Sequence, residues 1–362
     1  MQKINVNLKR GADNSYEICI GEGLLSDISD ELKSKSTSNA YAIITDSKVE
    51  KIYGRRLLKD FEEKNIHTHL ITFRAGEKSK NRQTKEKIED EMLELALGRD
   101  TCIIALGGGV VGDLAGFVAA TYMRGIPYIQ IPTTLLAQVD SSIGGKTGVN
   151  LKGAKNLIGA IHQPKKVIID LDFLQALPKG EFVNGLAEVI KYALIKDKKF
   201  FAFIEENIEK ILLRDKEAVR NLVTRSCEIK AFVVSHDERE KGLRKMLNYG
   251  HTIGHAIESA LDYKISHGNA ISIGMSYAGK LSAKKGFLSE DDLIRQDNLL
   301  EYVGLRKKLS HHKLKPGKIL EYIKYDKKIV NGKLNFILLS SIGDAFVSEE
   351  VSLEDIEEVM VE

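Results

Sequence analysis

The sequence predicts an α/β N-terminal domain, Rossmann-like with a mostly parallel sheet, followed by a mainly α-helical C-terminal domain. Apolar runs such as AYAIITD (40–46) and TCIIAL (101–106) are typical of parallel strands buried on both faces. These runs alternate with helical patterns as far as Leu177-Pro178, and helical periodicity dominates beyond that break. Because 362 residues suffice for two ordinary domains, we expect the domains to be 1–177 and 178–362.

The hydrophobic pattern of the first domain predicts each element in turn. Two segments with alternating apolar residues predict an opening hairpin, and later segments predict parallel strands joined by right-handed crossovers. The strands are expected at 3–9, 16–21, 40–46, 67–73, 101–106, 127–134 and 166–174. Helices are expected up to about residue 64, from about 81 to 97 with Gly98 as C-cap, and after the GGGVVGD turn.

The second domain reads as a series of helices from 181 to about 325. LNFILLSS (334–341) and DAFVSEEV (344–351) then predict a short hairpin. Ser352 and Asp355 are spaced to cap a terminal helix.

Composition bounds the class of protein. With 54 basic and 51 acidic residues the net charge is +3, which gives no nucleic-acid footprint. The three cysteines (Cys19, Cys102 and Cys227) are scattered, as expected in a reducing compartment. The first residues lack the apolar core of a signal peptide, and no run of 18 apolar residues occurs. We expect a cytoplasmic protein without a membrane or nucleic-acid partner.

RKMLNYGHTIGH (244–255) suggests a metal site. His251 and His255 are four residues apart, so both imidazoles point from one helix face. Thr252 stands where the metalloprotease signature has its catalytic Glu, which argues against peptide hydrolysis. His267, in SHGNAISIGM, is a further candidate ligand. The alternative is a helix that packs two hydrogen-bonded histidines into a core.

Glu188 lies among apolar residues in GLAEVIKYALI. A carboxylate in such a setting must be paired or must bind a cation. Lys191 is three residues further on and shares its helix face, so an ordinary surface Glu–Lys pair is the alternative.

Three strand ends carry candidate nucleotide-binding residues. GGGVVGD (107–113) follows a buried strand and opens a helix, where N–H groups and the helix dipole favour a pyrophosphate. Its spacing is not GxGxxG, and a tight strand–helix turn explains the glycines equally well. Asp46 could bind a ribose hydroxyl or cap the next helix. In AGEKSK (75–80), Glu77 and Lys80 could hold polar parts of a nucleotide.

DSSIGGKTGVNLKGAKNLIG (140–159) combines glycines with cationic and polar side chains, as a flexible anion-binding stretch would. It lacks the P-loop pattern, and a solvent loop is the alternative. The candidate residues are Asp140, Lys146, Lys152, Lys155 and Asn156.

Taken together, the ordered motifs resemble the 3-dehydroquinate synthases of the sugar phosphate cyclase superfamily. They run from residue 76 to 328: GEKSK, GGGVVGD, YMRG, IPTTLLAQVDSSIGGKTGVN, KNLIG, LPKGEFVNGLAEVIKY, DEREKGLRKMLNYGHTIGHAIE, SHG and DKK. The resemblance implies NAD in the first domain and a divalent metal, zinc or cobalt, held mostly by the second.

The resemblance also implies residue roles. It gives Glu188, His251 and His267 as metal ligands and places His255 beside the metal in contact with substrate. The implied NAD-binding residues are Asp46, Ala75, Gly76, Glu77, Lys78, Ser79, Lys80, Gly108, Gly109, Val110, Val111, Gly112, Asp113, Thr133, Thr134, Lys146, Lys155, Phe173, Leu174, Gln175 and Ala176. The implied catalytic and substrate-binding residues are Asp140, Lys146, Asn156, Lys191, Lys230, Arg244, Asn248, His255, Lys327 (or its neighbour Lys328) and, from a second subunit of a homodimer, Arg124.

The implied reaction converts 3-deoxy-D-arabino-heptulosonate 7-phosphate into 3-dehydroquinate and phosphate, a step of the shikimate pathway to aromatic amino acids. Gly180, Ala193 and Ala176 depart from the family pattern, which usually has Arg, Gly and a hydroxyl residue there. A metal-dependent polyol dehydrogenase of the glycerol type is the nearest alternative, although an uncharged polyol needs no such lysines. A non-catalytic nucleotide- or phosphate-binding protein is another, although it would give the three metal-ligand candidates no joint purpose.

Overall fold

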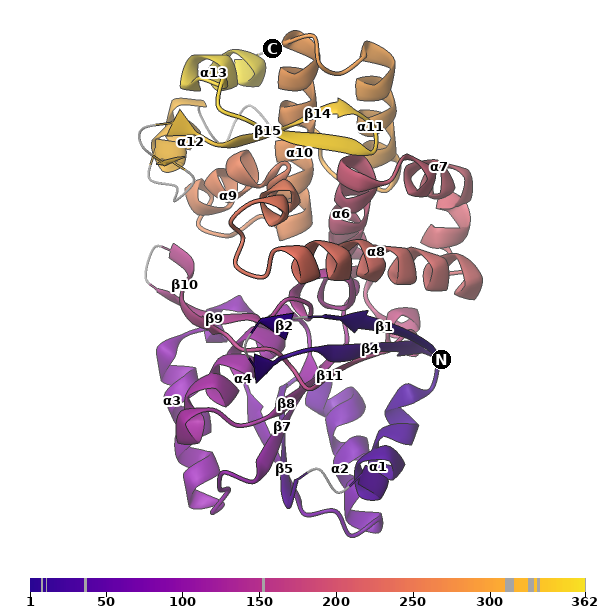
Figure 1. Cartoon of the computed structure of the whole chain (residues 1–362), viewed down its shortest axis with the longest axis vertical. Helices are drawn as coiled ribbons and strands as arrows, with labels where there is room; N and C mark the ends of the chain where they lie inside the picture. The colour runs from indigo at the N-terminus through magenta and orange to yellow at the C-terminus, as the bar shows by residue number, and fades with distance from the viewer. Residues whose placement is uncertain are drawn as a thin grey trace. The chain divides into compact units, whose positions relative to one another are not determined.

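The computed structural model describes residues 1–7, 9–10, 12–35, 38–151, 154–309, 316–324, 329–330 and 333–361. The chain divides into two compact units (Figure 1). The first comprises Met1–Leu177 and Lys230–Ser235, and the second comprises Pro178–Ile229 and His236–Glu362. Among the described residues, none of the helices is long and apolar enough to cross a membrane.

A seven-stranded sheet organises the first unit, in the order β1-β4-β11-β8-β7-β5-β6. Only the β1–β4 pair is antiparallel, with Gln2 opposite Ile20, and this is the predicted opening hairpin. The other pairs are parallel, which confirms the predicted fold class. The strands of this sheet are β1 (Gln2–Val6), β4 (Tyr16–Gly21), β5 (Ala40–Asp46), β6 (Thr68–Phe73), β7 (Thr101–Gly107), β8 (Tyr128–Pro132) and β11 (Lys166–Asp170).

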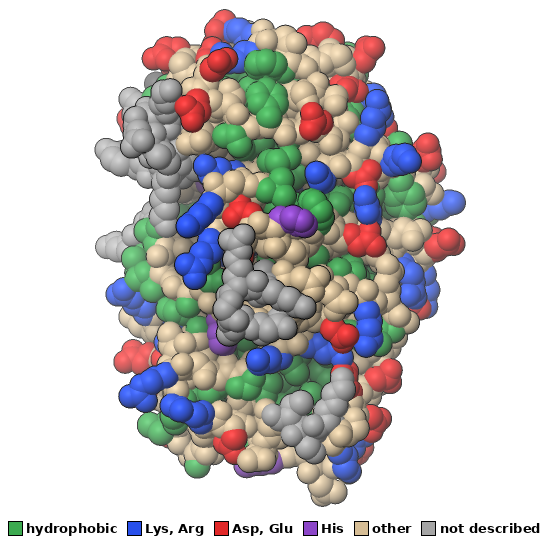
Figure 2. Space-filling model, viewed as in Figure 1, with side chains coloured by type: hydrophobic (Ala, Val, Ile, Leu, Met, Phe, Trp, Pro, Cys, Tyr) green, Lys and Arg blue, Asp and Glu red, His purple; other side chains and the backbone are tan. Residues whose placement is uncertain are grey.

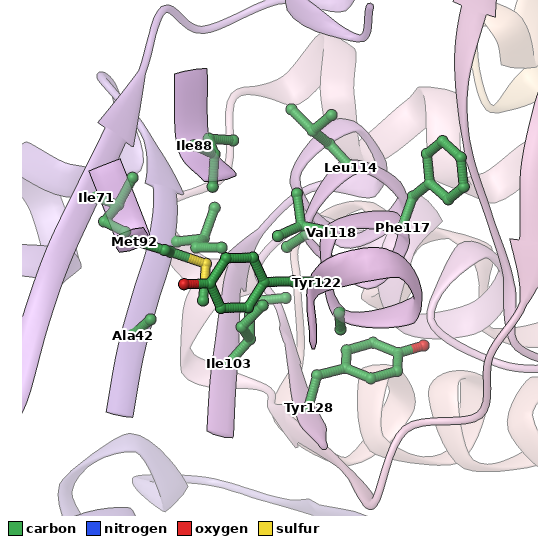
Figure 3. Close-up of a cluster of buried hydrophobic side chains, with 14 of the residues drawn as sticks. Ala42, Ile71, Ile88, Met92, Ile103, Leu114, Phe117, Val118, Tyr122 and Tyr128 are labelled. Carbon is green, nitrogen blue, oxygen red and sulfur yellow. The ribbon is translucent and has the colours of Figure 1, made fainter. Parts of the chain in front are cut away.

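Helices cover both faces of this sheet because its strands are apolar on both sides. Ala42 and Ile44 of β5 join one buried cluster with α3 and α4, drawn in Figure 3. Tyr41 and Ile43, the alternate residues, join another cluster with α1 and α2. The helical elements are α1 (Leu24–Lys35), η1 (Glu50–Gly54), α2 (Arg55–Glu63), η2 (Glu77–Ser79), α3 (Arg82–Glu94), α4 (Gly109–Thr121), η3 (Tyr122–Arg124), η4 (Ala137–Ser141) and α5 (Asp172–Ala176).

Helix α3 ends earlier than expected, and its left-handed residue is Ala96 (φ 53°) rather than Gly98. The N–H of Leu97 bonds to the carbonyl of Met92, and Leu97 and Met92 are both buried in the same cluster. Burial of this apolar pair offsets the strain of a non-glycine residue in the left-handed region.

The described part of the stretch 140–159 is mostly regular structure rather than a flexible loop. It includes the last two residues of η4 and most of an antiparallel ribbon, β9 (Lys146–Leu151) with β10 (Ala154–Ile161). A Cβ on Gly159 would lie 1.9 Å from the carbonyl oxygen of Thr147. Close backbone approach within the ribbon therefore requires at least this glycine. The other short ribbon of this unit is β2 (Lys9–Arg10) with β3 (Ala12–Asp13).

The predicted strand 166–174 is wrong in its second half, because β11 ends at Asp170 and α5 follows. The Asp170 carboxylate accepts the N–H groups of Gly23, Leu25 and Asp172, at 3.2, 2.9 and 3.0 Å. These bonds turn the chain at the end of the strand, which the apolar pattern could not show.

Helices make up most of the second unit, as predicted. They are α6 (Lys179–Lys196), α7 (Lys198–Leu212), α8 (Lys216–His236, whose residues Lys230–Ser235 belong to the first unit), η5 (Leu243–Asn248), α9 (His251–Ala260), α10 (His267–Lys284), α11 (Glu290–Tyr302), α12 (Pro316–Lys324) and α13 (Leu353–Val361). The predicted hairpin is β14 (Phe336–Ser341) with β15 (Asp344–Ser348), and β12 (Ile329–Val330) pairs with β13 (Lys333–Leu334). Ser352 and Asp355 form the predicted reciprocal cap of α13.

Candidate functional site

Helix α6 brings a carboxylate into the core of the second unit. Glu188 is fully buried, and its neighbours Leu186, Val189 and Ile190 are also fully buried. Its Oε2 accepts a hydrogen bond from the buried Lys191 Nζ. Among the described residues Glu188 Oε1 has no hydrogen-bond partner. The surface-pair alternative is therefore wrong, and one buried oxygen is left for another ligand.

Close helix packing carries two imidazoles to that oxygen. His251 is the first residue of α9, after Gly250 in the left-handed region (φ 75°). A Cβ on Gly274 of α10 would lie 1.9 Å from the Gly250 carbonyl oxygen, and one on Gly268 would lie 2.3 Å from the carbonyl oxygen of Asn184 in α6. Glycine at 268 and 274 thus lets α10 approach both α9 and α6. His267, the first residue of α10, is placed by this packing.

The distances suit a tetrahedral ion. Glu188 Oε1 lies 3.4 Å from Nε2 of His251 and 3.4 Å from Nε2 of His267. Ligand atoms about 2.1 Å from a tetrahedral ion are about 3.4 Å from one another. These three residues form a group that could hold a metal ion. The geometry therefore accommodates the metal that the sequence motifs predict.

The other nitrogen of each imidazole has an oxygen neighbour. His251 Nδ1 lies 3.0 Å from the Tyr249 carbonyl oxygen, and His267 Nδ1 lies 3.5 Å from Oε2 of the buried Glu258. A proton on each Nδ1 leaves the Nε2 lone pair for an ion, which is the usual arrangement around histidine ligands. The sequence analysis missed Glu258. It lies seven residues after His251 on the same face of α9, and this spacing is the signal that could have identified it.

Charge coupling sets the protonation of the cluster. Burial alone would raise the pKa of Glu188, but Lys191 and the two imidazoles hold it well below its ordinary value. Burial lowers the pKa of His251 despite the attraction of Glu188. Burial also opposes the charged form of His267, yet the adjacent carboxylates of Glu188 and Glu258 raise its pKa to about 10.

His255 lies beside this cluster. Its ring centroid is 5.1 Å from that of His251, and it forms a second potential ligand group with Glu258 and His267. The helical pair His251/His255 considered from spacing alone is therefore not the group that includes Glu188.

Two other predicted substrate residues of the second unit occupy η5. The buried Arg244 donates from Nη1 to the Glu238 carbonyl oxygen at 2.6 Å, and Asn248 donates to Glu240 Oε1 at 2.6 Å. The Asp237 carboxylate accepts backbone N–H groups on the approach to η5, including that of Arg244 at 3.0 Å. Hydrogen bonds thus fix the backbone from which Arg244 projects.

In the first unit, the GGGVVGD turn joins β7 to α4. Gly108 precedes the first turn of the helix, which has no side-chain cap. A Cβ on Gly109 would lie 3.0 Å from Ser141 Oγ, and one on Gly112 would lie 2.7 Å from Gln130 Oε1. Packing therefore explains part of this glycine pattern, as the tight-turn alternative proposed. Thr133 is buried and Thr134 half-buried at the end of β8, and the Thr134 hydroxyl accepts the Ala137 N–H at 3.2 Å.

Residues from three predicted segments converge on Lys80. Its buried ammonium group donates to the Asp113 carboxylate and, at 2.5 Å, to Asn156 Oδ1. Asn156 adopts a left-handed conformation (φ 55°), and its N–H bonds to Asn150 Oδ1 at 3.0 Å. Asn150 also donates to Glu77 Oε1 at 2.7 Å, so it ties the ribbon to η2. The sequence analysis missed Asn150, although it directly follows the GGKTGV motif.

A second ion pair in this unit joins Asp140 to Lys230. The Lys230 ammonium group donates to Asp140 Oδ1 at 2.5 Å and also to its carbonyl oxygen. Since Lys230 is 90 residues away in the chain, sequence spacing gave no indication of this contact.

The remaining predicted residues are more dispersed. Asp46 Oδ1 accepts the N–H groups of Lys48 and Val49, at 2.8 and 3.2 Å, in the turn that follows β5. The N-cap of η1 is Val49, which makes no side-chain capping bond, so Asp46 is not the N-cap of that helix. Its role toward a ribose stays a prediction. Lys146 and Arg124 are exposed, and Lys155 is half-buried. In 173–176, Phe173 and Leu174 are buried, whereas Gln175 and Ala176 are exposed. Lys152, Lys327 and Lys328 lie outside the described residues.

Figure 2 shows basic and acidic described side chains interspersed on the visible face. This pattern agrees with the small net charge of +3. The expected absence of a nucleic-acid partner stays a prediction.

Comparisons with known proteins agree over the whole chain. The family model described as 3-dehydroquinate synthase N-terminal matches residues 70–184, and the model described as 3-dehydroquinate synthase C-terminal matches residues 185–329. A 3-dehydroquinate synthase from Thermodesulfovibrio yellowstonii is 47% identical over 363 residues, with 100% of each chain covered.

Solved structures give the same picture. The 2-epi-5-epi-valiolone synthase of Streptomyces hygroscopicus subsp. jinggangensis 5008, with NAD+ and Zn2+ bound, is 28% identical (TM-score 0.89; 98% and 97% covered). A 2-deoxy-scyllo-inosose synthase, complexed with carbaglucose-6-phosphate, NAD+ and Co2+, is 29% identical (TM-score 0.89; 99% of each chain covered). An iron-containing alcohol dehydrogenase shares only the fold, at 16% identity and a TM-score of 0.68 over 95% and 96% of the two chains.

Proposed function

Because the chain belongs to the 3-dehydroquinate synthase family, we propose that it converts 3-deoxy-D-arabino-heptulosonate 7-phosphate into 3-dehydroquinate and phosphate. The single observation that carries this proposal is the orphaned, fully buried Oε1 of Glu188, equidistant from two imidazole nitrogens. This arrangement has the donor types and spacing that a catalytic divalent ion requires, because three protein ligands would leave one tetrahedral position of the ion for a substrate oxygen.

Glu188, His251 and His267 would hold the metal, zinc or cobalt. When bound, the ion supplies Lewis-acid chemistry that lowers the pKa of a substrate hydroxyl. Glu258 and the Tyr249 carbonyl orient the two imidazoles.

Lys191, Arg244, Asn248 and His255 would contact substrate in the second unit. Arg244 suits the substrate carboxylate because a guanidinium offers two parallel N–H donors that a lysine lacks. Its backbone is already fixed by Asp237, so little ordering is required on binding. Lys327 would join this set.

The first unit would bind NAD, which supplies a hydride acceptor and later donor. The Lys80–Asp113 pair and the uncapped N-terminus of α4 are the features that support this role. The other proposed NAD-binding residues are Asp46, Ala75, Gly76, Glu77, Lys78, Ser79, Gly108, Gly109, Val110, Val111, Gly112, Thr133, Thr134, Lys146, Lys155, Phe173, Leu174, Gln175 and Ala176.

Asp140, Lys146, Asn156 and Lys230 would meet polar and anionic groups of the substrate from the first unit. Lys230 and Asn156 are now satisfied by Asp140 and Lys80, respectively. An anionic substrate oxygen would thus replace the Asp140 carboxylate as the acceptor for Lys230, and Asn156 would offer its Nδ2 donor.

The proposal includes a cytoplasmic homodimer in which Arg124 of one subunit completes the site of the other. The three cysteines are buried and none forms a disulfide, which fits a reducing compartment. The exposure of Arg124 supports its role, since an exposed side chain is accessible to a second subunit. Sedimentation analysis tests the dimer.

The decisive experiment mixes the protein with a divalent metal, NAD and the seven-carbon phosphate substrate, and follows phosphate and NADH together. We expect phosphate release without accumulation of NADH, because the cofactor is regenerated in each turnover. Net NADH formation on glycerol, without phosphate release, would instead select the polyol dehydrogenase. Neither signal, in a protein that retains its metal, would select a non-catalytic binding protein.

A further inference from the structure

Two histidines lie together on the edge strand of the first unit, away from every residue assigned above. His67 directly precedes β6 and His69 is the second residue of that strand, so both side chains point to the same side. Strand β6 ends the sheet order and pairs with β5. His67 is exposed and His69 half-buried. The pair is therefore accessible to solutes.

The two rings meet through their Nε2 atoms, which are 3.0 Å apart. The ring centroids are 5.0 Å apart with an interplanar angle of 71°. Among the described residues, neither ring has a further hydrogen-bond partner. The hydrogen bond between them requires one Nε2 to carry a proton and the other to accept it.

We propose that His67 and His69 form a two-imidazole chelate for a divalent ion with square-planar or tetragonal preference, Cu2+ or Ni2+. Nitrogen atoms about 2.0–2.1 Å from one ion are about 2.9 Å apart at a 90° angle, but about 3.4 Å apart at a tetrahedral angle. The observed 3.0 Å fits the 90° arrangement. It contrasts with the 3.4 Å spacing around Glu188, which fits a tetrahedral ion.

Binding needs only a small chemical change. The proton on the donating Nε2 moves to Nδ1 of the same ring, after which both Nε2 lone pairs face the ion. Burial, and secondarily the neighbouring His67, lower the pKa of His69, which favours the neutral ring that an ion requires. Strand geometry holds the two side chains two residues apart on one side, so little rotamer freedom is lost on binding.

The ion would act on stability rather than on the proposed reaction. It would link the two histidine side chains at the N-terminal end of β6. At the C-terminal end of this strand, the Phe73 carbonyl oxygen accepts a hydrogen bond from Ser47 N. Because the ion binds the folded state, it would raise the melting temperature progressively as its concentration rises above the dissociation constant.

The test titrates Cu2+ into full-length protein already saturated with zinc, and follows it by electron paramagnetic resonance and thermal unfolding. His67→Ala and His69→Ala are compared with His236→Ala, which removes an exposed histidine of α8. His69→Gln serves in place of His69→Ala if the latter is unstable. His251→Ala separates this site from the cluster around Glu188.

We expect nitrogen couplings from two imidazoles in the wild type and in His251→Ala. Loss of either strand histidine should weaken Cu2+ binding by about a hundredfold, since the second ligand binds intramolecularly. His236→Ala should bind as the wild type does. Wild-type affinity in either strand variant, or loss of the signal in His251→Ala, would overturn the proposal.

Discussion

Replacing Glu258 tests how the protein orients its proposed metal ligand. Glu258 is buried, and its Oε2 lies 3.5 Å from Nδ1 of His267. Loss of such an outer partner typically weakens metal binding 10- to 100-fold, or about 1.4–2.7 kcal/mol. Because 3.5 Å is longer than a strong charge-assisted hydrogen bond, we expect Glu258→Gln, which keeps an acceptor oxygen, to lie near tenfold. Glu258→Ala, which removes the acceptor, should lie nearer a hundredfold.

Competition with a chromophoric chelator measures the zinc dissociation constant of each variant. Glu301→Gln is the matched control, since Glu301 is an exposed acid on α11. Thermal unfolding with and without zinc distinguishes a loss of His267 orientation from a general loss of packing. A tenfold larger dissociation constant removes about 1.4 kcal/mol of the stabilisation that zinc provides. A general loss of packing would instead lower the melting temperature equally with and without zinc. Zinc affinity of Glu258→Ala equal to that of the wild type would refute the orienting role.

Four further substitutions test other features. A Cβ on Gly180, in the first turn of α6, would meet no neighbouring atom within 4 Å. Because alanine favours the helix more than glycine does, Gly180→Ala should raise the free energy of unfolding, measured by urea titration, by about 0.5–1 kcal/mol. Gly268→Ala, where a Cβ would overlap α6, should instead lower the free energy of unfolding by about 1–3 kcal/mol. An increase in the free energy of unfolding of this variant would contradict the packing described for α10. Burial opposes the charge of Asp237, yet three backbone N–H groups hold its pKa below 3.8, so it contributes stability above pH 3.8 that is lost as pH falls through the folded-state value. Asp237→Asn should therefore lower stability at pH 7 more than at pH 2, and equal losses at both would speak against it. Lys191→Met leaves the Glu188 carboxylate without its ammonium partner. It should therefore destabilise the metal-free protein by about 3–5 kcal/mol and the zinc-loaded protein by less. Calorimetry on both forms measures the two losses, and equal losses would show that the pairing is unimportant.

Local sequence patterns predicted most of the fold. The continuous apolar runs at 40–46 and 101–106 correctly gave buried parallel strands, because burial on both faces leaves no polar alternation. The strand predicted through residue 174 failed, because the turn at Asp170 depends on N–H groups from residues 23 and 25, far away in the chain.

The ligand-bearing residues follow the same division. The buried setting of Glu188 and the histidine motifs were visible in the sequence, since they are properties of residue type and local spacing. Glu258, Asn150 and the Asp140–Lys230 pair were not predicted, because each acts through a partner that folding brings near.

The sequence by itself determined the kinds of chemistry available: two imidazoles, one carboxylate in an apolar helix, and glycine-rich turns after buried strands. Only the tertiary structure decided that Glu188 Oε1 stands 3.4 Å from both His251 and His267, and that His67 and His69 meet. The physical reason is that donor identity is written in the residue, whereas donor separation depends on how closely helices and strands pack.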